Sequence, residues 1–493
     1  MGVPESVRLS SLGVSSGSTT PVRPWSVRFH ERVARGFASS AGRRITFWLA
    51  CALLLFRALV TGRLIQRLVL RFVRMESACC RAGSPHYKFL ERYVDHLEGA
   101  GTFDRMRRFL REQPLSRAAA GLDAWVRIGL LGSLRHELLY KHRGTHGVPP
   151  RLLMEAQLAL SPGCDLTCEG CYTAEDRGGV APRRDRIAYL VDELVSCGAL
   201  AVHVIGKGEP FLSPRWANEL LDVIEARPQV FFTVATHGMH IDDALAARLG
   251  RLGNLVVLVA IDGPEAMHDA RRGAGSYRRV REALSRLRAH RAVFGFSCMV
   301  SAKSLEALTS PGFLRDREAD GCVIGIYSRY FPLTGSSLSD LALGDEELAR
   351  YRGRFELARR DTNIGLIDLD DVEQHTGCHS RAGESIYVDG ITGQVAPCLR
   401  VPFAPDECRL GGSQPGRLAE VLSHSYFEAY RTRSSSCPTW CGANLEAELG
   451  AVGALLEEHV TRPPRLGPYE ARAREATRTR RRLPLLPPET PDP

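Results

Sequence analysis

Short apolar runs alternate with amphipathic stretches between residue 152 and about residue 330. The apolar runs have the length and β-branched content of buried strands, and we expect strands at 154–161, 201–206, 230–236, 255–262, 294–300 and 322–328. The intervening stretches carry apolar residues at helical spacing, and we expect helices at 185–198, 213–226, 241–252, 276–290 and 303–316. Successive βα units of this kind imply parallel strands with right-handed crossovers, hence an α/β fold.

Four short polar segments follow the first four of these strands. They are GCDLTCEGCY (163–172), GKGEP (206–210), THG (236–238) and AIDGPEAMHDARRG (260–273). In parallel sheets and barrels, functional residues gather on the loops that follow the carboxyl ends of the strands. We therefore expect these segments to meet at one edge of the sheet.

The pattern differs on either side of this region. Residues 1–43 are rich in Ser, Pro, Arg and Gly and are predicted to be disordered, and 76–150 is predicted to be a charged helical extension. Helices are expected to link the core, 151–345, through 346–374 to a cysteine-bearing segment at 375–445. Residues 446–493 are expected to form a helix and then a Pro- and Arg-rich disordered tail.

Residues 44–75 combine an apolar run with regularly spaced arginines. Before Arg57 the uncharged run is shorter than the roughly 20 residues that span a bilayer. Farther on, Arg63, Arg67, Arg71 and Arg74 fall on one helical face. Such a helix can lie in a membrane interface or pack on the protein's own body, and these two interpretations stand level. An export signal at Arg43–Arg44 is a weaker third alternative.

The amino-acid composition and charge indicate a globular protein. Of the 493 residues, 44% are hydrophobic and 25% are charged, which is typical of a globular protein. The formal charge of +9 comes largely from the chain ends. An excess of basic residues can attract nucleic acid or anionic lipid. Here the excess is better explained as charged residues in solvated chain ends. We expect no nucleic-acid partner.

The 14 cysteines fall into two kinds. Single cysteines in apolar runs are expected to be buried thiols, whereas the clustered ones have the spacing of metal ligands in a reducing, cytoplasmic compartment. Cys164, Cys168 and Cys171 lie within eight residues. Thiolates are the usual ligands of iron–sulfur clusters, and three of them leave one iron open to a small ligand. A zinc loop is the alternative.

The Cys-x3-Cys-x2-Cys spacing, placed after the first strand, resembles the signature of the radical S-adenosylmethionine (radical SAM) superfamily. The resemblance covers about 155 to 330 and implies a partial (β/α)6 TIM-like barrel. It also implies a [4Fe–4S] cluster whose open iron chelates S-adenosylmethionine. Reductive cleavage then gives a 5′-deoxyadenosyl radical that abstracts hydrogen from the substrate.

The other three segments agree with the same family. GKGEP resembles its Gly-Gly-Glu-Pro motif, THG its Thr-Asn-Gly motif, and the stretch 260–273 its Ser-x-Asp-Gly-Pro motif with a following arginine that pairs with the ligand carboxylate. The cofactor-binding residues implied by the resemblance are Gly206, Gly208, Glu209, Pro210, Thr236, Asp262 and Arg272.

Three positions depart from the family's pattern. Lys207 places a long cation in the Gly-Gly-Glu-Pro turn, and Ala260 replaces a serine that contacts the ribose. Gly170 stands where the family often has an aromatic residue near the adenine, and Tyr172 is the expected substitute. These departures favour a competing hypothesis of another class, a metal-stabilised binding protein without catalysis.

A second set of cysteines lies near the C-terminus. Cys378, Gly393 and Cys398 have the spacing that opens SPASM/twitch extensions, where a β-hairpin presents cysteines to an auxiliary [4Fe–4S] cluster. Cys437 and Cys441 complete the expected ligand set, with Cys408 as a spare. A zinc ion on the same four cysteines is the alternative. The resemblance thus implies a shortened, cysteine-rich hairpin and helix domain.

The substrate radical would also have to lose an electron and a proton. The resemblance implies that the auxiliary cluster takes the electron and that an aspartate before Cys378 takes the proton, for which we name Asp370 and Asp368. SPASM/twitch relatives mostly modify peptides, so a peptide is the favoured substrate hypothesis. A lipid or other small natural product is the alternative. A flavodoxin- or ferredoxin-type donor is the expected electron source. Residues 45–74 are the candidate contact with a membrane surface.

Overall fold

The computed structural model describes most of the chain between residues 153 and 432. Within that range it leaves out 154, 172, 174–177, 200, 228–229, 331–338, 363, 371–378 and 403. The expected disordered end, the basic helix at 44–75, the helical extension and the C-terminal tail all lie outside the described residues. Within those residues no helix is long and apolar enough to cross a membrane.

Nine strands of the described residues form one sheet in the order β7-β6-β5-β4-β3-β2-β1-β8-β9. The strands are β1 (Glu155–Ala159), β2 (Ala201–Val204), β3 (Phe231–Thr236), β4 (Leu255–Ala260), β5 (Phe294–Val300), β6 (Ile324–Arg329), β7 (Gly365–Asp368), β8 (Ser385–Asp389) and β9 (Val395–Ala396). Neighbouring strands are parallel, except that β9 runs antiparallel to β8. All six expected strands and the α/β fold are confirmed.

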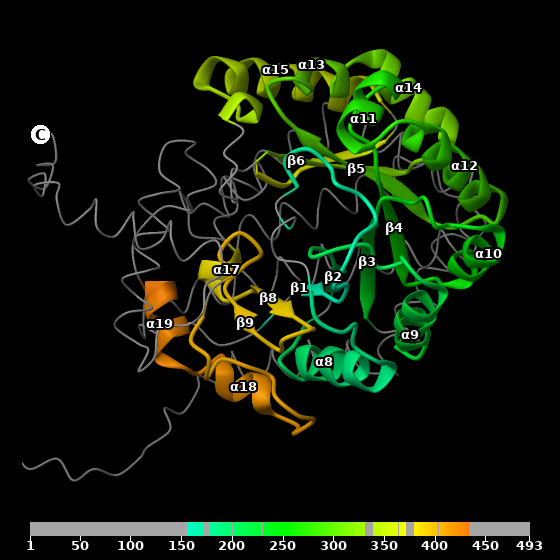
Figure 1. The fold of residues 1–493 in the computed structure, drawn as a ribbon. Coiled ribbons are helices and arrows are strands. Elements are labelled where there is room, and N and C mark those ends of the chain that lie inside the picture. Colours follow the sequence, from blue (N-terminus) through cyan, green and yellow to red (C-terminus); the bar gives the residue numbers. More distant parts are fainter. Residues whose placement is uncertain are drawn as a thin grey trace, which may run out of the picture.

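Helices lie along the outer side of the curved sheet (Figure 1). They are α8 (Arg184–Ser196), α9 (Pro214–Glu225), α10 (Asp243–Arg251), α11 (Glu265–Arg272), α12 (Ser276–Ala289), α13 (Leu305–Leu308), α14 (Pro311–Asp320) and α15 (Asp345–Asp361). Side-chain oxygens of Ser213, Asp242 and Ser310 cap the first turns of α9, α10 and α14. These caps explain why the helices begin directly after polar loop residues.

The two faces of the sheet differ because strand residues alternate in direction. Ala156, Leu158, Val202, Val204 and Phe232 face the helices and are almost fully buried. Residues between them, such as Gln157, His203 and Thr233, face the other way and remain half-exposed. The hydrophobic core therefore lies between sheet and helices, whereas the inner face of β1, β2 and β3 carries half-exposed polar side chains.

The C-terminal segment is part of the main sheet. Its expected hairpin is confirmed as β8 and β9, but β8 pairs with β1 instead of standing in a separate sheet. Residues 365–368 add β7 beside β6 in a segment where only helices were expected. This was missed because a four-residue strand has too few positions to show periodicity.

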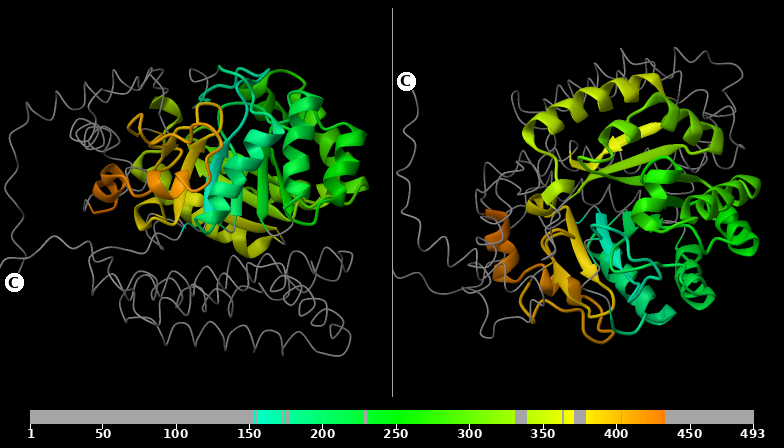
Figure 2. Two further views of the ribbon diagram at one scale, coloured as in Figure 1. Left: turned by 90° about the horizontal axis from the view of Figure 1, so that it is seen from below. Right: turned by 45° about the horizontal axis from the view of Figure 1, so that its top comes forward.

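Side chains of α8 bind the segment that follows the hairpin. Arg186 donates to Gly412 O at 2.6 Å, and the Tyr189 hydroxyl donates to Gln414 O at 2.9 Å. Glu193 accepts hydrogen bonds from the N–H groups of Gly416 and Leu418, both at 2.7 Å. The segment leads into α18 (Arg417–Val421) and α19 (Ser425–Thr432), while α17 (His379–Ala382) precedes β8. Figure 2 shows α18 and α19 beside the sheet, next to the hairpin.

Candidate functional site

The cysteine loop, residues 163–171, follows the carboxyl end of β1. Its three cysteines, Cys164, Cys168 and Cys171, are half-buried. Polar groups lie beside two of the sulfurs: the N–H of Leu166 is 3.5 Å from Cys164 Sγ, and the Thr173 hydroxyl is 3.4 Å from Cys171 Sγ. Donors of this kind stabilise thiolates, so the loop offers a donor set that fits an iron–sulfur cluster.

Other described cysteines have a different environment. Burial raises the pKa of Cys322 and of Cys408 to about 12. Burial likewise raises the pKa of Cys298 well above its ordinary value. These thiols stay protonated and behave as small apolar side chains. The sequence-based separation of loop cysteines from core cysteines is consistent with this contrast.

The turn after β2 packs directly on the start of the cysteine loop. The N–H of Glu209 donates to Gly163 O at 2.9 Å. At Gly208, an added Cβ would lie 2.0 Å from that same oxygen. Only glycine permits this approach, which joins the first two of the four predicted segments.

The carboxylate of Glu209 is buried and joins the turns after β2 and β3. Its Oε1 accepts from Phe211 N at 2.9 Å and from the Thr236 hydroxyl at 2.6 Å. Its Oε2 accepts from His237 N at 2.8 Å. Glu209 and Thr236, two of the predicted cofactor-binding residues, therefore hold each other in place.

His237 and His240 hold the residue that follows the first loop cysteine. Asp165 lies 2.8 Å from His237 Nε2 and 3.0 Å from His240 Nε2. His237 Nδ1 accepts from Met239 N at 3.1 Å, so its proton is on Nε2 and points at Asp165. Burial by itself raises the pKa of Asp165, but the hydrogen bond from His237 outweighs it and the pKa is lowered.

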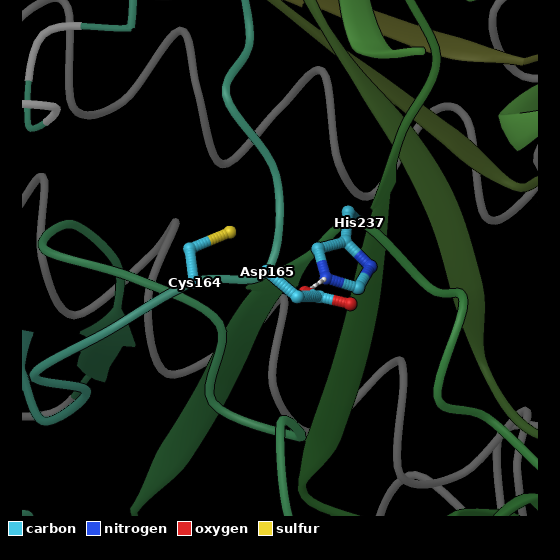
Figure 3. Close-up of side chains that lie close together, drawn as sticks. All are labelled: Cys164, Asp165 and His237. Carbon is cyan, nitrogen blue, oxygen red and sulfur yellow. Dashed lines mark hydrogen bonds and ion pairs between the residues drawn. The ribbon is translucent and has the colours of Figure 1, made fainter. Parts of the chain in front are cut away.

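Cys164 belongs to the same cluster of side chains, as Figure 3 shows. One ligand atom each from Cys164, Asp165 and His237 lies within 4.8 Å of the others, close enough to hold a single metal ion. The sequence reasoning missed the two histidines. The signal was the pair of histidines, three residues apart, just after the third strand.

The segment after β4 reaches the loop through two arginines at the end of α11. Asp262 is buried and pairs with Arg271 and Arg272, the latter at 2.5 Å. Arg272 Nη1 also lies 3.9 Å from Cys168 Sγ. Burial by itself would raise the pKa of Asp262, but the two guanidinium groups outweigh burial and hold it well below its usual range. Asp262 and Arg272, both predicted cofactor-binding residues, are thus brought to the second loop cysteine.

Gly170 has no room for a side chain. Its φ is +67°, and an added Cβ would lie 2.8 Å from the ring of Tyr330 and 3.0 Å from Leu341. The aromatic ring at this point of the loop therefore comes from the end of β6. Tyr172, the expected substitute, lies outside the described residues.

The two predicted proton acceptors, Asp370 and Asp368, both lie in the interior of the fold. Asp370 is fully buried, with Arg400 at 2.6 Å and Arg329 at 3.2 Å. Burial by itself would raise the pKa of Asp370, but Arg400 and Arg329 outweigh burial and lower it. Asp368 is paired in register with Tyr327, whose hydroxyl donates to Leu308 O at 2.8 Å in the helix-facing core. Paired residues share a face of the sheet, so Asp368 faces the helices.

The auxiliary ligand set is only partly described. Cys398 is half-buried beside the hairpin, and Cys408 is buried. Cys378, Cys437 and Cys441 lie outside the described residues. The ligand set stays a prediction, and the burial of Cys408 agrees with its assignment as the spare.

Comparison with known proteins gives one family. Residues 158–301 match the model of the Radical SAM superfamily. The curated proteins contain no matching sequence. Among solved structures, SuiB from Streptococcus suis bound to S-adenosylmethionine is 15% identical, with a TM-score of 0.49, and the match covers 75% of this chain and 90% of SuiB.

Two further solved structures are similar at the same level. SuiB bound to its precursor peptide SuiA has 15% identity and a TM-score of 0.49 over 66% of this chain and 78% of SuiB. Native anSMEcpe with bound AdoMet has 15% identity and a TM-score of 0.46 over 66% of this chain and 96% of anSMEcpe. At these values the likeness carries no inference about substrate or mechanism.

Proposed function

The chain belongs to the radical SAM superfamily, and from this premise we propose that it is an enzyme that modifies a ribosomally made peptide or protein by hydrogen abstraction. When bound, the iron–sulfur cluster and S-adenosylmethionine supply the reductive chemistry and the 5′-deoxyadenosyl radical. The residues of the chain bind and orient these groups and exclude water from them.

One observation carries the proposal: the turns after β2 and β3, and the end of helix α11 after β4, each contact the cysteine loop. Gly163 accepts from Glu209 N, Asp165 pairs with His237, and Glu169 N donates to Arg271 O at 3.1 Å. A zinc loop needs its four ligands and no such surroundings. Three thiols enclosed by three polar segments instead support a site for a cluster together with a zwitterionic ligand.

Each segment has a part in this proposal. Backbone groups of 206–210 would receive the ligand's ammonium, because the Glu209 carboxylate is already bonded to Thr236 and His237. Arg272 would pair with the ligand carboxylate while it stays next to Cys168. Asp262 fixes the orientation of that guanidinium, since it is buried and bonded to it.

The peptide class rests on the C-terminal hairpin. The spacing of Cys378, Gly393 and Cys398 resembles SPASM/twitch extensions, and strands β8 and β9 lie between these cysteines. An auxiliary cluster on Cys378, Cys398, Cys437 and Cys441 would accept the electron of the substrate radical, and a flavodoxin or ferredoxin would supply the reductant.

Of the two predicted proton acceptors, Asp370 is better supported as an anchor. A carboxylate with a lowered pKa between two guanidinium groups is a weak base. Its contact with Arg400, two residues after Cys398, ties the auxiliary-cluster segment to the end of β7.

Anaerobic reconstitution tests the proposed function. The wild-type protein should be brown, bind about eight irons as two cubanes, and form 5′-deoxyadenosine from S-adenosylmethionine after reduction. The triple variant Cys164→Ala/Cys168→Ala/Cys171→Ala should lose about four irons and all cleavage. Bound zinc without cleavage would instead support the non-catalytic binding protein. Neighbouring genes that encode a short precursor peptide would provide the substrate for a second assay.

A further inference from the structure

Lys207 occupies an unfavourable backbone conformation in the turn after β2. Its φ is +43°, in the left-handed region that glycine adopts without strain. A non-glycine residue is strained in this conformation. Gly206 and Gly208 flank it, so the turn tolerates one strained position between two glycines. The side chain of Lys207 must therefore contribute something that a third glycine would not.

That side chain reaches the C-terminal hairpin. Lys207 Nζ lies 2.6 Å from Asp389 Oδ2, and the two side chains are only 11% and 6% exposed. The partners are 182 residues apart in the sequence. Asp389 ends β8, next to Ala159 at the end of β1. The ion pair therefore joins the turn after β2 to the hairpin across the end of β1.

Asp389 also shapes the hairpin turn. Its Oδ1 accepts from Ile391 N at 3.0 Å and from Thr392 N at 3.3 Å, and its backbone oxygen accepts from Gly393 N at 2.7 Å. One carboxylate thus binds the turn between β8 and β9 with one oxygen and Lys207 with the other. Any movement of the hairpin, and of Cys398 behind it, changes the geometry at Lys207.

Charge gives the pair a second consequence. S-adenosylmethionine carries an ammonium and a sulfonium, and in the proposed function the ammonium lies at the turn that contains Lys207. A further cation a few ångströms away in a partly buried site would oppose binding by electrostatic repulsion. Asp389 neutralises that cation.

We propose that Lys207 and Asp389 form a charge-compensated pair that positions the C-terminal hairpin on the S-adenosylmethionine turn and keeps that turn neutral toward a cationic ligand. The second part rests on the proposed function. The first part concerns only the hairpin. Both residues are positioning residues, because they act through the turn and not on the reacting atoms.

Three variants of the full-length protein separate these contributions. Asp389→Asn retains an Oδ1 acceptor for the hairpin turn, removes the charge and replaces the oxygen that accepts from Lys207 with an amide NH2 group. Lys207→Met removes the cation and keeps a side chain of similar length, and the double variant removes both charges. Lys303→Met is the matched control, because Lys303 is 52% exposed and pairs with Glu169 of the cysteine loop and with Asp340.

Equilibrium binding of S-adenosylmethionine to the reconstituted protein tests charge compensation. We expect Asp389→Asn to weaken binding about tenfold or more, the equivalent of 1.4 kcal/mol. The double variant should return to within about threefold of wild type, because the uncompensated cation is gone. S-adenosylhomocysteine keeps the ammonium that lies at this turn, so its binding should weaken by a similar factor. A double variant that binds no better than Asp389→Asn overturns charge compensation.

Hydrogen exchange over residues 385–396 tests the positioning of the hairpin without any ligand. Lys207→Met should raise exchange there by about tenfold, while Lys303→Met should not. Unchanged exchange in Lys207→Met overturns the positioning role. If the wild-type protein binds no S-adenosylmethionine, the proposed function fails, and the exchange measurement still decides whether the pair positions the hairpin.

Discussion

Gly170 shows how one residue can depend on a distant strand. The ring of Tyr330, at the end of β6, fills the space where a side chain at 170 would lie, and the backbone there has a positive φ. An aromatic residue at position 170 would have to displace Tyr330. The glycine is therefore matched to its surroundings and does not indicate a lost site.

Gly170→Ala should lower both stability and cluster loading. The added methyl would meet the Tyr330 ring at 2.8 Å in a backbone conformation that alanine avoids. We expect a loss of about 1–3 kcal/mol in the free energy of unfolding and a reduced iron content after reconstitution. Urea unfolding and iron analysis measure the two effects.

Gly353→Ala is the matched control for this substitution. Gly353 lies inside α15 with no atom within 4 Å of an added Cβ. Alanine there should stabilise the helix by about 0.5–1 kcal/mol. Equal stability changes for the two variants would contradict the packing argument.

At the scale of elements, α8 holds the C-terminal segment by its side chains. Glu193 is 4% exposed and accepts from the N–H groups of Gly416 and Leu418 at the start of α18. These N–H groups have no intrahelical partner. A carboxylate from another helix thus supplies the cap that α18 lacks in its own sequence.

Glu193→Gln should loosen this contact. An amide offers one oxygen to two N–H donors, so one buried donor is left without its partner. Hydrogen bonds to a charged group contribute about 1.5–3 kcal/mol, and we expect a loss within that range together with faster proteolysis near residues 411–416. Glu420→Gln, at an exposed ion pair with Arg417, should cost about 0.5 kcal/mol or less. Similar losses in both variants would argue against a cap.

Asp370 joins two other elements, the end of β7 and the segment after β9. Its partners Arg329 and Arg400 lower its pKa against the opposing effect of burial. A carboxyl group whose folded pKa lies below its unfolded value of about 3.9 stabilises the fold above that pH. This stability is lost as the pH falls through the folded pKa.

Asp370→Asn should therefore have a pH-dependent cost. Near neutral pH, removal of the charge takes the buried anion away from two partly buried guanidinium groups, at a cost of about 3–5 kcal/mol. The difference from wild type should shrink as the pH falls below about 4. Urea unfolding of both proteins between about pH 7 and pH 3 measures it. A difference that stays constant or grows in acid would contradict the ion-pair role.

At the scale of the whole molecule, two cysteine-bearing segments are attached to the same sheet. β8 pairs with β1, the strand that carries the cysteine loop at its carboxyl end. The loop and the hairpin therefore both adjoin strand β1, although more than 200 residues separate them in the chain. The auxiliary site, as proposed, is built on the same sheet as the first cluster site.

Single cysteine variants test this arrangement. Cys398→Ala should lower the iron content by about four per chain, the content of one cubane. Cys408→Ala should leave the iron content unchanged, because Cys408 is buried and its pKa is about 12. Iron analysis of both reconstituted variants, with the wild type alongside, gives the answer. Loss of iron in Cys408→Ala alone would reverse the assignment of ligand and spare.

Much of the core could be predicted from the sequence. The six strands, most of the helices between them and the order of the four polar segments were predicted, because strand and helix periodicity is a local property of the backbone. The short helix α11 was not predicted, and the helix expected at 303–316 is divided into α13 and α14. Cysteine spacing is equally local, and it pointed to the loop after β1. The sheet position of β8 and the existence of β7 were not predicted, since strand pairing depends on contacts between distant segments.

Contacts between distant side chains were decided by the tertiary structure alone. The pairing of Lys207 with Asp389, the two histidines on Asp165 and the ring of Tyr330 on Gly170 each join segments from different turns. No spacing in the chain indicates which partner each of these residues contacts, because the partner depends on strand register and on where each crossover ends. The sequence by itself therefore determined which chemistry the chain carries, and the packing of the sheet determined which residues hold that chemistry in place.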